Sequence, residues 1–379
     1  MTFKTLSLYI AILTGLSFCT QPNSNNKMEE EKNGRIELLI GTYTGSGSEG
    51  IYRTFLDIAS ERLTEPELVV NAENPSYLAI SKNRERVFSV NETTQGGVSA
   101  FRWNQERTQL ELINQQPSQG DYPCYVALHP EENLFAAGNY MTGTVLAYPV
   151  NKKGELASDP VVRQHEGVGK DTTRQEGPHA HCTIFSNDGK WLYAVDLGID
   201  QIIKYPVDGQ SIGEGSTAFS CDPGDGPRHL IFHPTQSMAF LINELSSTVF
   251  SLSLDQSTGD FKSISKVSTL PPRFKEANSC ADIQISNDGK YLYASNRGHN
   301  SIAVIAVSES GELSRITNES VHGDWPRNFT LSPDIDNQFL IVANQKSNNV
   351  VVFERDLETG LPSYTGNEIE ISQPVCLKF

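Results

Sequence analysis

Four side chains suited to acid–base and anion chemistry stand at equivalent points of a repeating pair of short apolar segments. They are His181, Arg228, Glu244 and Arg297. A Glu or a His can act as a general base, and two Arg can hold an anionic substrate and a developing oxyanion. Because Arg228 and Glu244 belong to the same pair of segments, we expect their side chains to be near neighbours.

The equivalence of these positions comes from a pattern that recurs down the chain. A turn residue, often Pro, opens a short apolar strand that ends in Ser or His. A few polar residues follow, and then a second apolar strand that ends in Asn or Asp. The pattern is clearest at 180–196 and 280–296, and it also fits 75–91, 123–139, 227–243 and, with a two-residue insertion, 326–344.

The two halves of one further copy stand apart at the two ends of the sequence. Residues 374–379 are a first strand with no second, and residues 37–43 are a second strand with no first. With a third and a fourth strand, each unit has about 50 residues, which is typical of a propeller blade. We therefore expect an all-β, seven-bladed β-propeller of four-stranded antiparallel blades over residues 36–379. The C-terminal strand should close the ring by pairing with the N-terminal strands.

Such a ring gathers the four residues at one opening of its central channel, here called the mouth. The first two strands of a blade lie nearest the channel, and the start of the first and the end of the second open on the same face. His181 and Arg228 follow the turn position, whereas Glu244 and Arg297 follow the terminal Asn or Asp. Arg327, next around the ring, could add a further anion contact.

Three more residues are candidates for binding substrate. Glu92 occupies the same column as Glu244 in an earlier blade, and Arg174 lies in the longest irregular insertion, 165–179, which could fold over the mouth. His179 forms a His-x-His pair with His181 that could bind a metal from one strand face. Because spacing places no third ligand, we expect neither a metal nor another cofactor.

Each of these residues also has a purely structural interpretation. A single His or Arg in a channel is more often part of a hydrogen-bond or salt-bridge network than of a reactive site. The Asn or Asp at the strand ends and the Asn-Asp-Gly turns at 187–189 and 287–289 are expected to serve structure alone.

Composition limits the possible partners. A formal net charge of −16 over 379 residues argues against a nucleic-acid partner, although it leaves room for a local positive pocket. The five cysteines beyond Cys19 have no metal-binding spacing and are odd in number, so we expect no disulfide framework.

The N-terminus has the order of a bacterial lipoprotein signal. Residues 1–18 read as a signal peptide, Cys19 as the candidate lipidation site, and residues 19–35 as a flexible tether. We therefore expect export to the periplasm or cell envelope, with membrane contact only through the lipid anchor. The alternative is an uncleaved N-terminus on a cytoplasmic protein.

Several segments together resemble a known family. These are IGTYTGSGSEGIY, ENPSYLAIS, RQEGPHAHC, DLGID, GDGPRHLIFHP, NEL, SNDGKYLYASNRG and GDWPRNFTLSP. In this order, over about residues 36–379, they resemble the seven-bladed propeller lactonases, which comprise propeller-type 6-phosphogluconolactonases and fungal carboxymuconate cyclases. In the cyclase branch, the proposed active-site set is a His, two Arg and a Glu. These fall on His181, Arg228, Glu244 and Arg297.

The resemblance implies hydrolysis of 6-phospho-D-glucono-1,5-lactone to 6-phosphogluconate without a metal. In that hypothesis Glu244 or His181 activates water and Arg228 stabilises the oxyanion. Arg297 and Arg327 would then hold the phosphate, since a guanidinium matches phosphate geometry.

Other functions stay open at this point. An exported protein would not meet a cytoplasmic phosphosugar lactone, which favours an unphosphorylated sugar lactone or another anionic ring ester. A cycloisomerase acting on muconate-like diacids is a second enzyme hypothesis. A non-catalytic propeller that binds a glycan or protein is a third, and it predicts a closed salt-bridge network where an enzyme predicts an open, positive pocket. We expect a monomer, because the ring closes its own strand edges.

Overall fold

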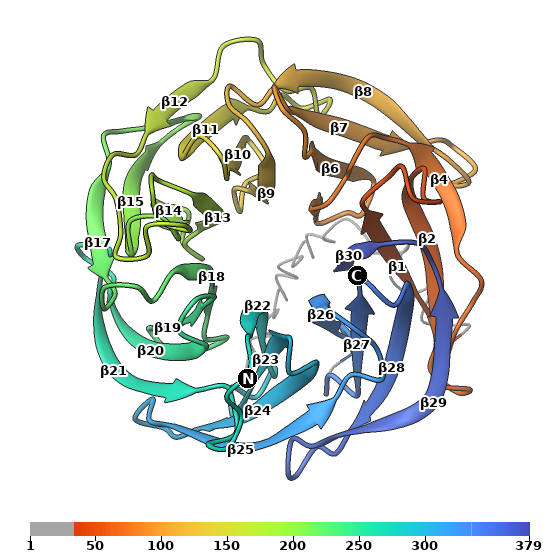
Figure 1. The fold of residues 1–379 in the computed structure, drawn as a ribbon. Helices are drawn as coiled ribbons and strands as arrows, with labels where there is room; N and C mark the ends of the chain where they lie inside the picture. Colours follow the sequence, from red (N-terminus) through yellow and green to blue (C-terminus); the bar gives the residue numbers. More distant parts are fainter. Residues whose placement is uncertain (1–33, 335) are drawn as a thin grey trace, which may run out of the picture.

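The chain folds into a ring of seven antiparallel sheets, which confirms the predicted seven-bladed propeller (Figure 1). The computed structural model describes residues 34–334 and 336–379, and within these ranges all regular structure is strand. The predicted signal peptide (1–18), Cys19 and most of the predicted tether lie outside the described residues. No helix in the described ranges is long and apolar enough to cross a membrane.

We number the blades I to VII from the N-terminus. Blade I contains β30 (Pro374–Lys378), β1 (Arg35–Thr42), β2 (Gly50–Asp57), β3 (Arg62–Leu63) and β4 (Glu67–Asn71). Blade II contains β5 (Leu78–Ile80), β6 (Arg86–Asn91), β7 (Gly97–Trp103) and β8 (Leu110–Pro117). Blade III contains β9 (Pro123–Leu128), β10 (Leu134–Asn139), β11 (Thr144–Pro149) and β12 (Val161–Gln164).

The remaining four blades follow in chain order. Blade IV contains β13 (Ala180–Phe185), β14 (Trp191–Asp196), β15 (Gln201–Asp208), β16 (Ser211–Ile212) and β17 (Ser216–Ser220). Blade V contains β18 (Pro227–Phe232), β19 (Met238–Asn243), β20 (Thr248–Asp255) and β21 (Asp260–Ser268). Blade VI contains β22 (Ser279–Ile285), β23 (Tyr291–Arg297), β24 (Ser301–Val307) and β25 (Leu313–Ser320). Blade VII contains β26 (Pro326–Leu331), β27 (Phe339–Asn344), β28 (Asn349–Arg355) and β29 (Pro362–Glu370).

The two ends of the described chain meet in blade I, as the split repeat predicts. β30 pairs antiparallel with β1, and Cys376 lies opposite Gly41 (Figure 1). Leu377 is buried in a cluster with Leu38 and Ile40 of β1 and with side chains of blade VII. The closing strand therefore contributes both hydrogen bonds and apolar packing to the ring.

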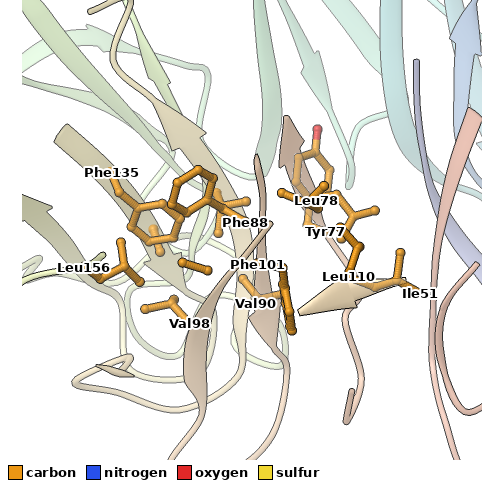
Figure 2. Close-up of a cluster of buried hydrophobic side chains, with 14 of the residues drawn as sticks. Ile51, Tyr77, Leu78, Phe88, Val90, Val98, Phe101, Leu110, Phe135 and Leu156 are labelled. Carbon is orange, nitrogen blue, oxygen red and sulfur yellow. The ribbon is translucent and has the colours of Figure 1, made fainter. Parts of the chain in front are cut away.

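Apolar clusters between neighbouring blades hold the ring rigid. The second strands are buried along almost their whole length, because both faces of a blade pack against other blades. Figure 2 shows one cluster, in which Ile51 of blade I, Phe88 and Phe101 of blade II, and Phe135 of blade III come together. This packing gives the inner strand ends fixed positions.

A β-bulge near the start of the first strand is the feature that turns side chains toward the channel. In β13, β18 and β26 the pairing skips one residue: His181, Arg228 and Arg327 respectively. β9 and β30 carry comparable shifts, and β22 skips both Ala281 and Asp282. An extra residue in one strand changes the direction of the side chains next to it. The bulges therefore interrupt the alternation of side chains near the start of several first strands around the channel.

In blades III, VI and VII, the terminal Asn ties the blade to the chain that enters it. The side-chain amides of Asn139, Asn296 and Asn344 donate to the carbonyls of Ser118, Thr269 and Val321, at 2.7, 3.2 and 3.0 Å. These bonds satisfy buried backbone groups at the strand ends, which is the structural role expected of this column.

We predict that Leu377→Ala destabilises the protein by about 2–5 kcal/mol, because it leaves a cavity where the ring closes. Chemical denaturation of the purified protein measures the loss. The control is Leu357→Ala, whose side chain is 44% exposed and should change stability by less than about 0.5 kcal/mol. Equal effects of the two substitutions would contradict closure by β30.

Candidate functional site

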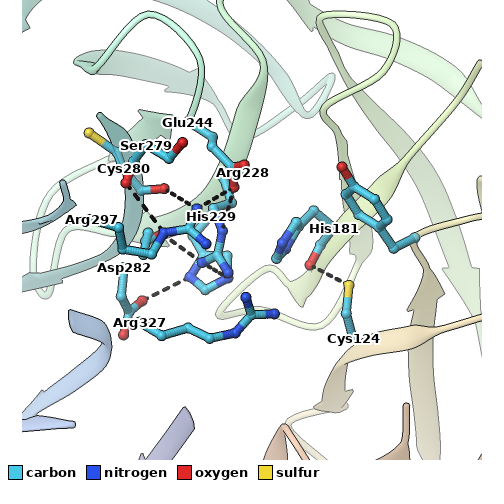
Figure 3. A network of polar contacts seen from close by, with 12 residues as sticks. Cys124, His181, Arg228, His229, Glu244, Ser279, Cys280, Asp282, Arg297 and Arg327 are labelled. Carbon is cyan, nitrogen blue, oxygen red and sulfur yellow. Dashed lines mark hydrogen bonds and ion pairs between the residues drawn. The ribbon is translucent and has the colours of Figure 1, made fainter. Parts of the chain in front are cut away.

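The candidate residues meet where blades IV to VII face the channel. Arg228 is the bulged residue of β18, Glu244 directly follows β19, and Arg297 ends β23. His181 is the bulged residue of β13 and lies across from them, with the Arg327 side chain reaching between the two sides (Figure 3). Residues far apart in sequence thus face one another across one mouth.

Glu244 is the hub of the cluster. Its Oε2 accepts from Arg228 Nε at 3.0 Å and pairs with Arg297 Nη2 at 2.7 Å. Its Oε1 accepts from Arg174 Nη2 at 2.7 Å. One buried carboxylate therefore holds three guanidiniums, and neither oxygen is without a partner.

The three guanidiniums determine the protonation state of Glu244. Burial alone would raise the pKa of Glu244, but Arg297, Arg228 and Arg174 together hold it well below its usual value. Burial lowers the pKa of Arg297 to about 10, so its guanidinium stays charged at neutral pH. Both oxygens of Glu244 already bind guanidiniums and neither is left for a water molecule, so Glu244 suits an anchor better than a general base.

Arg228 keeps one edge of its guanidinium unused. Its Nη1 donates to Ala281 O at 2.7 Å and to His229 Nε2 at 2.9 Å. Together with the Nε bond to Glu244, these contacts fix the plane of the group. Nη2 has no hydrogen-bond partner within residues 34–334 and 336–379, and Arg228 lines a small cavity with Arg327. That edge is available to an oxyanion.

His181 is a buried imidazole whose ring packs against other rings. It is 4% exposed, and among the described residues nothing bonds its buried Nδ1. Its ring contacts the rings of His229 and Tyr140 edge-on, at 5.3 and 5.6 Å between centroids. Burial, reinforced by the charges of Arg228 and its neighbours, holds the pKa of His181 well below its usual value. The ring is therefore neutral and able to accept a proton.

Arg327 belongs to a second cluster on the other side of the mouth. Its Nη2 donates to the Tyr43 hydroxyl at 2.8 Å, and that hydroxyl donates to Glu92 Oε1 at 2.8 Å. Ser76 Oγ donates to the other oxygen of Glu92. Glu92 therefore orients Tyr43 and Arg327 rather than presenting a free group to a ligand.

The long insertion before β13 reaches the mouth through Arg174. Its Nη2 also donates to the Tyr140 hydroxyl at 3.1 Å. Gln175, which is fully buried, anchors the loop by donating to Leu197 O and to Asp200 Oδ1, both at 2.8 Å. The side chain of Arg174 is 38% exposed, so it covers the Glu244 cluster from the solvent side.

His179 supports the wall of the mouth. Its Nδ1 donates to Tyr140 O at 2.7 Å, and its ring stacks on that of Tyr140 at 4.5 Å. Within the described ranges, no three His, Cys, Asp or Glu side chains are grouped so as to hold a metal ion. The five cysteines of these ranges are free thiols.

The mouth carries excess positive charge within an acidic chain. Its guanidiniums are those of Arg174, Arg228, Arg297 and Arg327, and its carboxylates are those of Glu92 and Glu244. Four against two leaves two positive charges within this cluster, and the neutral His181 adds none. Glu176, which lies 3.6 Å from His179 Nε2 and is half-exposed, adds one carboxylate at the solvent edge of the mouth. Asp282, beside His229, and Lys378, beside Tyr77, contribute one charge of each sign. Such a site attracts a small anion.

Two members of the network, His229 and Asp282, were not candidates from the sequence. Strand alternation places neighbours such as Arg228 and His229 on opposite faces, but the bulge in β18 brings both to the channel. Asp282 reaches His229 only because the irregularity in β22 spans two residues. In the sequence, only the position of His229 directly after Arg228 could have suggested that it belongs to the site.

Comparisons with known proteins agree with this architecture. A family model described as "Lactonase, 7-bladed beta-propeller" matches residues 37–379. The chain is 38% identical to the 6-phosphogluconolactonase of Bacillus subtilis over 343 residues, covering 90% of this chain and 97% of that protein. A Lactobacillus plantarum crystal structure has a TM-score of 0.84 and 35% identity, covering 91% of this chain and 99% of that one. The periplasmic gluconolactonase of Pseudomonas aeruginosa has a TM-score of 0.84 and 31% identity, with the same coverage.

We predict that the free energy of unfolding falls as the pH drops from 6.5 toward about 4.5. Burial lowers the pKa of His229 from 6.5 to about 4. Below pH 6.5, His229 therefore becomes protonated in the unfolded chain while it stays neutral in the folded protein. The stability present above pH 6.5 is lost on acidification. His229 alone would account for up to about 3 kcal/mol.

Denaturation curves at a series of pH values measure this slope, and His229→Gln should show a shallower one. A free energy of unfolding that stays constant over this range would contradict the burial of neutral histidines in the mouth.

Proposed function

We propose that this chain, which belongs to the seven-bladed β-propeller lactonases, hydrolyses 6-phospho-D-glucono-1,5-lactone to 6-phosphogluconate at its mouth. One observation carries the proposal. Among the described residues, nothing bonds Nδ1 of the neutral His181 ring, and the ring lies near guanidiniums that keep unused N–H groups (Figure 3). General-base attack on an anionic ester requires this combination.

His181 is the proposed base. Its neutral ring accepts a proton from water while the water oxygen attacks the lactone carbonyl carbon. The tetrahedral oxyanion that forms is held by the free Nη2 edge of Arg228. Collapse of this intermediate breaks the bond to the ring oxygen, and the imidazolium returns its proton to that oxygen. The products are a free hydroxyl group and a carboxylic acid, which releases its proton to solvent and leaves as the carboxylate.

Substrate binding would itself strengthen this base. The charges of Arg228, Arg327 and Arg297 help to depress the pKa of His181 in the free protein. An anion bound among them offsets those charges, so the pKa of His181 rises toward its ordinary value. Proton transfer is then most favourable when the lactone is in place.

Arg297 and Arg327 are the proposed phosphate contacts. A phosphate ester carries close to two negative charges at neutral pH, which matches the two excess positive charges of the mouth. Arg297 Nη1 and Arg327 Nη1 have no hydrogen-bond partner among the described residues. Each guanidinium would therefore have a free Nη1 to donate to the phosphate oxygens.

An unphosphorylated sugar lactone is the second candidate. We infer export from the lipoprotein-like residues 1–18 and from Cys19 as the lipidated residue. The likeness to a periplasmic gluconolactonase supports the same location. In the periplasm or cell envelope, the guanidiniums would stabilise the oxyanion and the product carboxylate instead of a phosphate.

Hydrolysis is favoured over the remaining hypotheses. The Glu244 cluster is the closed ion-pair network expected of a non-catalytic module, but a binding module has no need of an unpartnered buried base. Cyclisation of a muconate-like diacid would use similar groups, so the preference for lactone hydrolysis rests on similarity to proteins named 6-phosphogluconolactonase and gluconolactonase.

Arg228→Ala should lower kcat for lactone hydrolysis by about 10²–10³-fold, the usual cost of losing one oxyanion donor. Turnover of 6-phosphoglucono-1,5-lactone is followed by the acid released, after subtraction of spontaneous hydrolysis. The matched control is Arg102→Ala, an exposed arginine on blade II, which should keep full activity. Unchanged turnover by a folded Arg228→Ala protein refutes the assignment.

The pH profiles should identify the base. With His181 as base, the acid limb of kcat should lie at higher pH than that of kcat/KM, because bound anion raises the His181 pKa. Coincident acid limbs in the two profiles would contradict the role of His181, because a bound anion must raise the pKa of this base above its value in the free enzyme.

A further inference from the structure

A buried hydrogen-bond chain leads to Arg228 from the strand that closes the ring. It passes through three side chains on three blades: Asn328 in β26, Asp282 in β22 and His229 in β18. All three are at most 3% exposed. Figure 3 shows Asp282, His229 and Arg228 in line on one side of the mouth.

Asp282 is the acceptor at the centre of this chain. Its Oδ1 accepts from His229 Nδ1 at 2.8 Å and from the Ile283 amide at 2.9 Å. Its Oδ2 accepts from Asn328 Nδ2 at 2.5 Å and from the Phe329 amide at 3.4 Å. Both oxygens thus face two donors each, and an ionised carboxylate is the side chain that accepts from all four.

The carboxylate fixes the tautomer of His229. Since Asp282 only accepts, the imidazole must carry its proton on Nδ1, and its Nε2 is left as an acceptor. That acceptor receives the N–H of Arg228 Nη1 at 2.9 Å. The position of one proton on His229 therefore decides whether Arg228 is attracted or repelled.

Asn328 carries the chain to the closing strand. Its Oδ1 accepts from the Leu377 amide of β30 at 2.6 Å, so its Nδ2 must point to Asp282. The amide group has a single satisfactory orientation, because its two ends meet a donor and an acceptor respectively. Ring closure and the orientation of Arg228 are thus linked by consecutive hydrogen bonds.

We propose that Asp282 and His229 are positioning residues, which hold the unused Nη2 edge of Arg228 where the oxyanion develops. Asn328 extends this control to β30, so that Arg228 is fully oriented only in a closed ring. The functional half of the inference rests on the proposed role of Arg228. The structural half, the Nδ1–H tautomer of His229, does not depend on any activity.

Asp282→Asn is the informative substitution. Asparagine replaces one carboxylate oxygen by an amino group. Each oxygen of Asp282 accepts from two donors, so the amino group would face donors in either orientation. If the amino group turns to His229, the ring must carry its proton on Nε2, against the N–H of Arg228. If it turns to Asn328, two amino groups meet. Either outcome breaks a hydrogen bond between Asn328, Asp282 and His229, although the side chain at position 282 keeps its size.

The test combines nitrogen NMR of the imidazole rings with lactonase kinetics on the full chain. The His229→Gln variant identifies the His229 signals among those of the eight histidines. In the wild type we expect a proton on Nδ1 and none on Nε2. Asp282→Asn should shift that proton and lower kcat by about 10–100-fold, a common loss when a supporting partner is removed, with a smaller change in KM.

The matched control is His165→Gln. His165 forms an equally buried pair with Asp196 at 2.6 Å, but its other nitrogen meets the Tyr205 hydroxyl at 2.7 Å rather than an arginine. This variant measures the general cost of breaking a buried His–Asp pair, and it should leave kcat within about twofold of the wild type.

The outcomes separate the two claims. A His229 proton on Nε2 in the wild type overturns the positioning role, whatever the activity. Equal kcat losses in Asp282→Asn and His165→Gln also overturn it. If the wild type has no lactonase activity but Asp282→Asn moves the His229 proton, the proposed function fails and the hydrogen-bond chain stands.

Discussion

The mouth depends on one carboxylate that holds three guanidiniums. Without Glu244, the charges of Arg174, Arg228 and Arg297 would repel one another inside a buried site. Removing one partner of a buried ion pair typically costs about 3–5 kcal/mol, because the remaining charge is left uncompensated. Yet Glu244 neutralises only part of the cluster, so the surplus charge remains available to an anionic ligand. The same group thus stabilises the cluster and leaves surplus charge within it, while both of its own oxygens stay bound to guanidiniums.

The ring supplies the frame that such a cluster needs. Each blade contributes one strand start and one strand end to the mouth, and packing between blades fixes these ends. The bulges then turn single residues out of the strand alternation, toward the channel. Rigid strands place charged groups more accurately than mobile loops do, which keeps the cost of reorganisation low when charge develops. Arg174 is the exception, because it arrives on an insertion, and a buried glutamine anchors that insertion.

The register of the repeats was enough to predict the ring, its closure by β30, and the contact between Arg228 and Glu244. Two kinds of information were beyond it. The first was the hydrogen-bond partner of each side chain. Glu92 occupies the position equivalent to Glu244, but its two oxygens accept from Tyr43 and Ser76. The second was the position of the β-bulges. His229 and Asp282 reach the site because of bulges in β18 and β22, and the hydrophobic pattern of the sequence does not reveal these bulges. Equivalent positions are therefore predictable from a repeat, whereas the protonation and saturation of each side chain depend on neighbours from other blades.

The central claim is that surplus positive charge at the mouth selects an anionic lactone. The most direct measurement is the ratio of kcat/KM for 6-phosphoglucono-1,5-lactone to that for glucono-1,5-lactone, with the purified protein. Two charge-assisted contacts to the phosphate, at about 1.5 kcal/mol or more each, predict a ratio of at least about 100. A ratio near or below one would contradict the account, because the guanidiniums would then make no distinction between a charged and a neutral lactone.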